Sequence, residues 1–208
     1  MIKKLADNIA YYISRELGYD DEKSEILSYG LEIFLGTTIK LLSISIFAYF
    51  LNTFETTMIV LISFIIFRRI IGGTHCNTYN KCYFLSIFLI LMLGILGNIV
   101  KLSQESNYIA ILSVYIFAVV SSVLWVPAGT EKKMIRNKNL RKKIKIKTIL
   151  LLSIWLGVVF YLSKNSLYYS YIFSSLLGVV FAFLFTTPLG YRLINFKQLK
   201  MNLKQGGE

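Results

Sequence analysis

Residues 83–100 read YFLSIFLILMLGILGNIV, a stretch of 18 residues with no charged side chain and few polar ones. The hydrocarbon core of a bilayer is about 30 Å thick, and a helix needs roughly 20 residues to cross it. Over the whole chain 55% of the residues are hydrophobic and 16% are charged, with a mean hydropathy of +0.60. One soluble core of 208 residues cannot hide so much apolar surface. The composition therefore predicts an all-α, polytopic integral membrane protein.

Five further apolar stretches lie before and after this one along the chain. Together they predict six membrane-spanning helices at residues 30–51, 53–71, 83–100, 108–126, 148–163 and 167–187. The second is short, because Thr56 to Phe67 supplies only 12 residues. It reaches the length of a span only by including Glu55, Arg68 and Arg69, so we expect these charges at the membrane interfaces.

Residues 1–28 precede the first predicted span and begin with an amphipathic pattern. Ile2, Leu5, Ile9 and Ile13 recur at steps of three and four, with charged residues between them. This pattern predicts a helix that can lie flat on the membrane surface. The whole chain, 1–208, is predicted to form a single membrane domain that ends in a tail at 188–208.

Lysine and arginine are distributed unevenly between the predicted connections. Of the 23 basic residues, 20 lie in residues 1–28, 68–81, 131–147 and 189–208. The alternate connections hold only Lys101 and Lys164. Because cytoplasmic loops carry the excess of basic residues, both termini and the loops at 68–82 and 131–147 are predicted to be cytoplasmic.

The loop at 131–147 carries nine basic residues against one acid, Glu131. This charge predicts attraction to anionic membrane lipid, where each basic residue contributes about 1 kcal/mol. An acidic protein or peptide segment is the alternative partner. Nucleic acid is not expected, because no aromatic platform or nucleic-acid-binding module accompanies the charge. A homodimer is compatible with a bundle of six helices, but no pattern of small residues locates its interface.

The residues with the most reactive side chains lie between the second and third predicted spans. Residues 67–82 read FRRIIGGTHCNTYNKC and contain the single histidine, His75, and both cysteines, Cys76 and Cys82. A cysteine nucleophile acts as a thiolate and needs a base to take its proton, most often histidine. The stretch is therefore a candidate site for nucleophilic catalysis.

A break in the helix is needed before His75 can reach Cys82. Residues seven apart on a continuous helix are separated by about 10 Å along its axis. Gly72 and Gly73 favour such a break, and they also permit a tight turn, close approach of a substrate, or backbone N–H groups for an oxyanion. Geometry alone leaves Cys76 open as the nucleophile. On the alternative interpretation the histidine is an interfacial polar residue, and the cysteines and glycines serve packing.

Two ionisable residues fall within the first predicted span. Glu32 can accept a hydrogen bond from the His75 imidazole. Alternatively, it can pair with Arg68 or Arg69. Lys40 lies deeper, where it can snorkel or line the bundle interior. A polar site inside the bundle could bind a solute, so a peptide or solute transporter without proteolytic activity is the alternative function.

One histidine cannot supply an HExxH zinc motif, and GxxxxGK[ST] and GxSxG motifs are absent, so neither a metal nor a cofactor is predicted.

Two stretches resemble the accessory gene regulator B (AgrB) family of bacterial membrane cysteine endopeptidases. The first is Arg-Arg-x-x-Gly-Gly-x-His-x6-Cys at 68–82, and the second is Val-Pro-Ala-Gly-Thr-Glu-Lys-Lys at 126–133. The resemblance extends over nearly the whole chain. It implies a catalytic dyad of His75 and Cys82, without a cofactor, at the cytoplasmic face of the bacterial cell membrane.

The resemblance also implies the substrate, an AgrD-type propeptide of quorum sensing with an acidic C-terminal part. Cys82 would cleave the bond after the signal segment and hold that segment as a thioester. A Cys or Ser of the propeptide would then close a thiolactone or lactone ring at high effective concentration. Arg68 and Arg69 are the candidates for contact with the acidic part, and Glu32 is an auxiliary residue.

Overall fold

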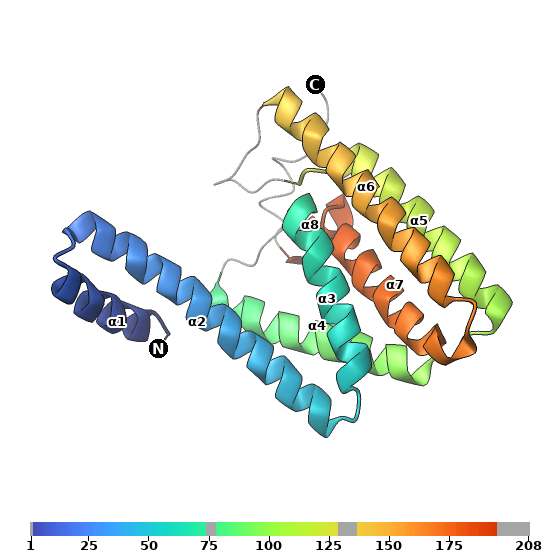
Figure 1. Ribbon diagram of the computed structural model, residues 1–208, viewed down its shortest axis with the longest axis horizontal. Helices are drawn as coiled ribbons and strands as arrows, with labels where there is room; N and C mark the ends of the chain where they lie inside the picture. The colour runs from blue at the N-terminus through green and yellow to red at the C-terminus, as the bar shows by residue number, and fades with distance from the viewer. Residues whose placement is uncertain (1, 74–77, 129–136, 195–208) are drawn as a thin grey trace. The chain divides into compact units, whose positions relative to one another are not determined.

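The computed structural model describes residues 2–73, 78–128 and 137–194, and every regular element in these ranges is a helix (Figure 1). The elements are α1 (Ile2–Leu17), α2 (Asp21–Phe50), α3 (Phe54–Ile71), α4 (Tyr79–Ile99), α5 (Gln104–Trp125), α6 (Lys138–Leu162), the 3-10 helix η1 (Ser166–Tyr168), α7 (Tyr169–Leu184) and α8 (Pro188–Ile194). The all-α prediction is confirmed. The chain divides into two compact units, Met1–Phe47 and Ala48–Glu208.

Five helical segments of the described chain are long and apolar enough to cross a membrane. They are Asp21–Phe50, Tyr79–Ile99, Gln104–Trp125, Lys138–Leu162 and Ser166–Leu184. These lengths and compositions support a polytopic membrane protein. α3 is not among them, because its 18 residues include Glu55, Arg68 and Arg69. The count of six spans stays a prediction that depends on α3.

Two helices begin well before the apolar stretches that predicted them. α2 starts at Asp21 instead of residue 30, and α6 starts at Lys138 instead of residue 148. Residues 138–147 of the predicted loop are thus helical, and the side chain of Asn137 caps them by accepting two backbone N–H groups. Hydropathy marks only the part of a helix that lies in lipid, whereas backbone hydrogen bonding continues beyond it.

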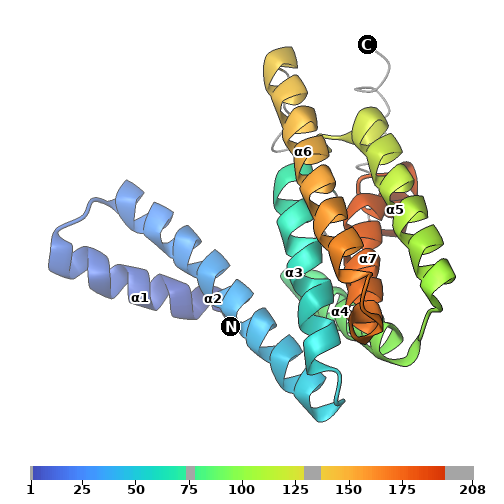
Figure 2. The same ribbon diagram turned by 45° about the vertical axis from the view of Figure 1, so that its right-hand side comes forward.

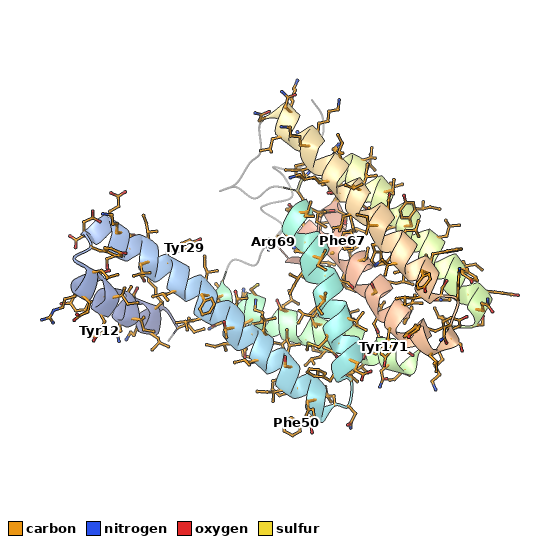
Figure 3. All side chains as sticks on the ribbon, in the orientation of Figure 1. Tyr12, Tyr29, Phe50, Phe67, Arg69 and Tyr171 are labelled. Carbon is orange, nitrogen blue, oxygen red and sulfur yellow. The ribbon has the colours of Figure 1, made fainter. Side chains whose placement is uncertain are left out.

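In the first unit, α1 runs antiparallel alongside the beginning of α2 (Figures 1 and 2). Ala6, Ala10 and Ser14 of α1 are buried, whereas Leu5 and Tyr12 are exposed. Figure 3 labels Tyr12 on α1. The apolar face of α1 is therefore only partly covered, and its contact with the membrane surface stays a prediction.

In the second unit, α7 is the central helix and packs against α3, α4 and α5 (Figure 2). Gly178 of α7 permits close approach, because a Cβ there would lie 2.6 Å from the carbonyl oxygen of Val60 on α3. The Ser175 hydroxyl lies 2.9 Å from the Ser63 hydroxyl of α3 and accepts a 2.9 Å hydrogen bond from Trp155 Nε1 of α6. Small residues and hydrogen bonds between helices are typical of packing in lipid.

The C-terminal end of α3 is anchored by an aromatic cluster. Phe67, labelled in Figure 3, is 2% exposed and packs edge-on against Trp155 of α6, with ring centroids 6.2 Å apart. Its ring also lies 5.7 Å from that of Phe183 on α7. This cluster holds α3 in place immediately before the residues that form the candidate site.

Candidate functional site

α3 ends in a two-glycine turn that only glycine can adopt without strain. Gly72 has a φ of +74° and Gly73 a φ of +123°, both in the region that side-chain-bearing residues rarely adopt. A Cβ on Gly72 would lie 2.3 Å from the carbonyl oxygen of Ala128. A Cβ on Gly73 would lie 2.9 Å from the carbonyl oxygen of Phe185 and 1.8 Å from the Arg68 guanidinium. Local conformation and close packing therefore both require these glycines.

The turn is joined to the segment that follows α5. Ala128 N donates a 2.9 Å hydrogen bond to the Ile71 carbonyl, and Gly73 N donates a 3.0 Å bond to the Ala128 carbonyl. Ala128 is also packed with Tyr191 of α8, which is 1% exposed. Residues 71–73 of the first motif thus lie beside Ala128 of the second, although the two are far apart in the sequence.

The glycine N–H groups are already used within the protein. Gly72 N donates to the Arg68 carbonyl at 3.2 Å, and Gly73 N donates to Ala128. An N–H group that is bonded to a carbonyl of its own chain is not free to stabilise an oxyanion. The structure therefore assigns Gly72 and Gly73 to the turn and does not support the oxyanion hypothesis for their N–H groups.

The two arginines at the end of α3 occupy different environments. Arg68 is partly buried, and its guanidinium carbon lies over the ring of Phe185, 5.7 Å from the centroid. Arg69 is exposed on another side of α3 from Phe67 (Figure 3). Sequence reasoning treated both as substrate contacts, because adjacent residues of one type look alike until the neighbouring helices are known.

Cys82 lies in the first turn of α4 and is partly buried. Its N–H donates to the carbonyl of Thr78 at 3.1 Å, so that helical hydrogen bonding is established at this residue. Its Sγ lies 4.0 Å from the Ser86 hydroxyl, one turn further along the same face.

His75 and Cys76 lie outside the described residues. The chain on either side of them meets the condition that a His75–Cys82 pair requires: α3 ends at Ile71, and Thr78 has extended backbone angles before α4 begins at Tyr79. Thus no continuous helix joins His75 to Cys82, and the separation of about 10 Å expected on such a helix does not apply.

Glu32 is partly buried in the first unit, on α2. It lines a groove of about 590 Å³ between α1 and α2 together with the carboxylates of Asp7, Asp21 and Glu25. Both interpretations of Glu32, as partner of His75 or of an arginine, stay predictions. Within residues 2–73, 78–128 and 137–194, no three His, Cys, Asp or Glu side chains lie close enough together to hold a metal ion.

Sequence reasoning missed two residues that shape this end of the molecule, Phe185 and Tyr191. Phe185 lies under the Arg68 guanidinium, and Tyr191 is buried on α8. Pro188 is the one available signal, since proline is favoured at the first position of a helix and α8 begins there. The predicted tail at 188–208 therefore starts with a helix that contributes to the core.

A model of the accessory gene regulator B family matches residues 6–186 of the chain. The chain belongs to this family. An AgrB-like protein of Clostridium perfringens strain SM101 is 27% identical over 93% of this chain and 95% of its own length. An AgrB-like protein of Clostridium beijerinckii is 32% identical over 78% of this chain and 79% of its own, and the accessory gene regulator protein B of Staphylococcus epidermidis is 26% identical over 73% and 75%. Solved structures include no match.

Membership of the AgrB family confirms the resemblance recognised at 68–82 and 126–133. The matched region contains both motifs and α2 to α7, whereas α8 lies beyond it. The glycine turn and Cys82, with the helices α3 and α4 that carry them, are thus within the part of the chain that matches the AgrB family.

Proposed function

We propose that this AgrB-family protein is a membrane cysteine endopeptidase that processes an AgrD-type quorum-sensing propeptide, with Cys82 as nucleophile and His75 as base. The helix break carries the proposal. The Gly72–Gly73 turn and the extended Thr78 separate α3 from α4, so that the histidine and the cysteine are free of the spacing of a single helix. Family membership supports the class of substrate.

The reaction proceeds by acyl transfer. The Cys82 thiol gives its proton to the His75 imidazole, and the sulfur attacks the carbonyl carbon of the last residue of the signal segment. The C–N bond breaks, the imidazolium returns the proton to the departing amine, and the signal segment remains as a thioester on Cys82. A Cys thiol or Ser hydroxyl of the propeptide then attacks the thioester, which closes the ring and restores the Cys82 thiol.

Arg69 and Arg68 have different proposed roles, contact with the substrate and positioning of the turn. The exposed position of Arg69 supports contact with the acidic C-terminal part of the propeptide, where a guanidinium binds carboxylates through paired hydrogen bonds. The packing of Arg68 against Phe185 and Gly73 supports a positioning role for this residue at the turn.

The membrane arrangement is part of the proposal. We count α3 as the sixth span, place both termini and the site at the cytoplasmic face, and assign the basic start of α6 to contact with anionic lipid. Lys145 has a second role there, since its Nζ donates a 2.6 Å hydrogen bond to the Val123 carbonyl near the end of α5.

The test uses wild-type, Cys76→Ala, Cys82→Ala and His75→Ala proteins in liposomes with a propeptide encoded beside the gene. Mass spectrometry follows both the peptide and the protein. We expect wild type and Cys76→Ala to release the C-terminal fragment, and Cys82→Ala and His75→Ala to leave the propeptide intact. Normal cleavage by Cys82→Ala would overturn the mechanism. Movement of intact peptide across the liposome without cleavage would favour the transporter.

A further inference from the structure

The opposite end of α3 borders a cavity that the proposed chemistry does not use. The cavity has a volume of about 610 Å³ and is formed by the end of α2, the starts of α3 and α7, and the end of α4. Glu55 at one end of α3 and Gly72 at the other are about 26 Å apart along the helix axis at 1.5 Å per residue. If α3 spans the membrane as proposed, this cavity opens at the face away from Cys82.

The cavity contains one charged side chain, and that charge is negative. Glu55 accepts a hydrogen bond from the Tyr171 hydroxyl of α7, and Figure 3 labels Tyr171 near this end of α3. No Lys, Arg or described His lines the cavity, and Glu55 has no ion-pair partner among the described residues. The Glu55 carboxylate is therefore the charged group that a cation entering this cavity would meet.

The remaining lining residues also suit a cation, and specifically one that carries N–H groups. Tyr49, Phe50 and Phe54 line the cavity together with Glu55, and aromatic ring faces attract positive charge. Asn98 and Ser170 add oxygen atoms that accept hydrogen bonds. A primary ammonium group offers a positive charge and three N–H donors, which matches a carboxylate, neutral acceptors and aromatic rings together.

We infer that this cavity is a binding site for a primary ammonium group. The group has two possible sources, a free amine or the headgroup of an aminophospholipid at the membrane interface. Exposed aromatic residues are also common at membrane interfaces without any ligand. The carboxylate distinguishes the two cases, since an interfacial aromatic belt has no need for Glu55.

The experiment uses the full chain in nanodiscs of phosphatidylglycerol, a lipid without an amine. Ethanolamine is titrated and its binding is followed by saturation-transfer NMR, with ethylene glycol as a neutral probe of similar size. We expect saturable binding of ethanolamine and none of ethylene glycol. Glu55→Gln should weaken binding by about 10-fold or more, because it removes the charge that strengthens the hydrogen bond. Tyr171→Phe should weaken binding less, because the carboxylate remains.

Glu105→Gln is the matched control. Glu105 also lies in the first turn of a helix, α5, but does not line the cavity. We expect this variant to bind ethanolamine as wild type does. Equal weakening in Glu55→Gln and Glu105→Gln would overturn the inference, as would the absence of saturable binding to the folded wild-type protein.

A second arm identifies the source of the ammonium group. In nanodiscs that contain phosphatidylethanolamine, an aminophospholipid ligand would compete and lower the apparent affinity for ethanolamine in wild type. An unchanged affinity would instead support a free amine. Both results retain the ammonium site, and neither depends on whether the protein cleaves a propeptide.

Discussion

The two ends of α3 are held by different kinds of interaction. At the C-terminal end, Gly72 and Gly73 are fixed by backbone hydrogen bonds and leave no room for a Cβ beside Ala128. At the N-terminal end, Glu55 and Tyr171 meet through their side chains at an open cavity. A turn held by backbone tolerates very few residue types, whereas a side-chain contact tolerates conservative exchange. The comparison indicates that the path of the chain matters most at the end that carries the proposed chemistry.

The largest effect is expected from Gly72→Ala at the C-terminal end of α3. The added Cβ would meet the Ala128 carbonyl oxygen at 2.3 Å, in a backbone conformation that alanine rarely adopts. We expect the free energy of unfolding to fall by about 2–4 kcal/mol and propeptide cleavage to be lost. Unfolding in mixed micelles and fragment release measure the two effects. Gly157→Ala on α6 is the control, because its Cβ meets nothing within 4 Å. Equal stability of the two variants would contradict the role of the turn.

Arg68 and Arg69 differ in burial within the C-terminal end of α3. Arg68→Ala removes a guanidinium packed over Phe185, and we expect a loss of about 1–2 kcal/mol of stability. Arg69→Ala removes an exposed side chain, and we expect a change within about 0.5 kcal/mol but a raised KM for a propeptide with an acidic end. Thermal unfolding and steady-state cleavage separate the two variants. If Arg69→Ala proved less stable than Arg68→Ala, the assignment of Arg68 to packing at the turn and of Arg69 to the exposed surface would be wrong.

The middle of the bundle supplies an intermediate case. Ser175→Ala removes hydrogen bonds with Ser63 and Trp155 that join three helices. We expect a loss of about 0.6–1.7 kcal/mol, the range found for hydrogen bonds between membrane helices. Ser153→Ala is the matched control, since this exposed hydroxyl donates only to the Ile149 carbonyl of its own helix. A thermal midpoint as high in Ser175→Ala as in Ser153→Ala would show that the contact between helices contributes nothing.

The smallest effect is expected at the N-terminal end of α3. Glu55→Gln keeps the size of the side chain and an acceptor for the Tyr171 hydroxyl. Because Glu55 is exposed, we expect stability to change by less than about 1 kcal/mol and propeptide cleavage to stay at the wild-type rate. The same micelle and fragment-release assays apply. A large loss of cleavage in Glu55→Gln would mean that the two ends are coupled.

Most of the helices could be predicted from hydropathy, since a membrane span needs a long apolar stretch whatever its neighbours are. Helix starts were less predictable where polar turns extend past the lipid, as at Asp21 and Lys138. α8 was missed because its 7 residues carry no hydrophobic period that stands out, and its Tyr191 is buried only by tertiary packing.

Hydropathy along the chain was sufficient to predict a helical, polytopic membrane protein, and side-chain chemistry was sufficient to locate its reactive residues at 67–82. Hydropathy and side-chain chemistry are local properties, so one sequence is sufficient to read them. The pairing of Ala128 with the glycine turn, and the inward position of Arg68 in contrast to Arg69, became visible only in the folded chain. These features depend on contacts between segments far apart in the chain, and the hydrogen bonds and close packing that create them exist only once the helices have assembled.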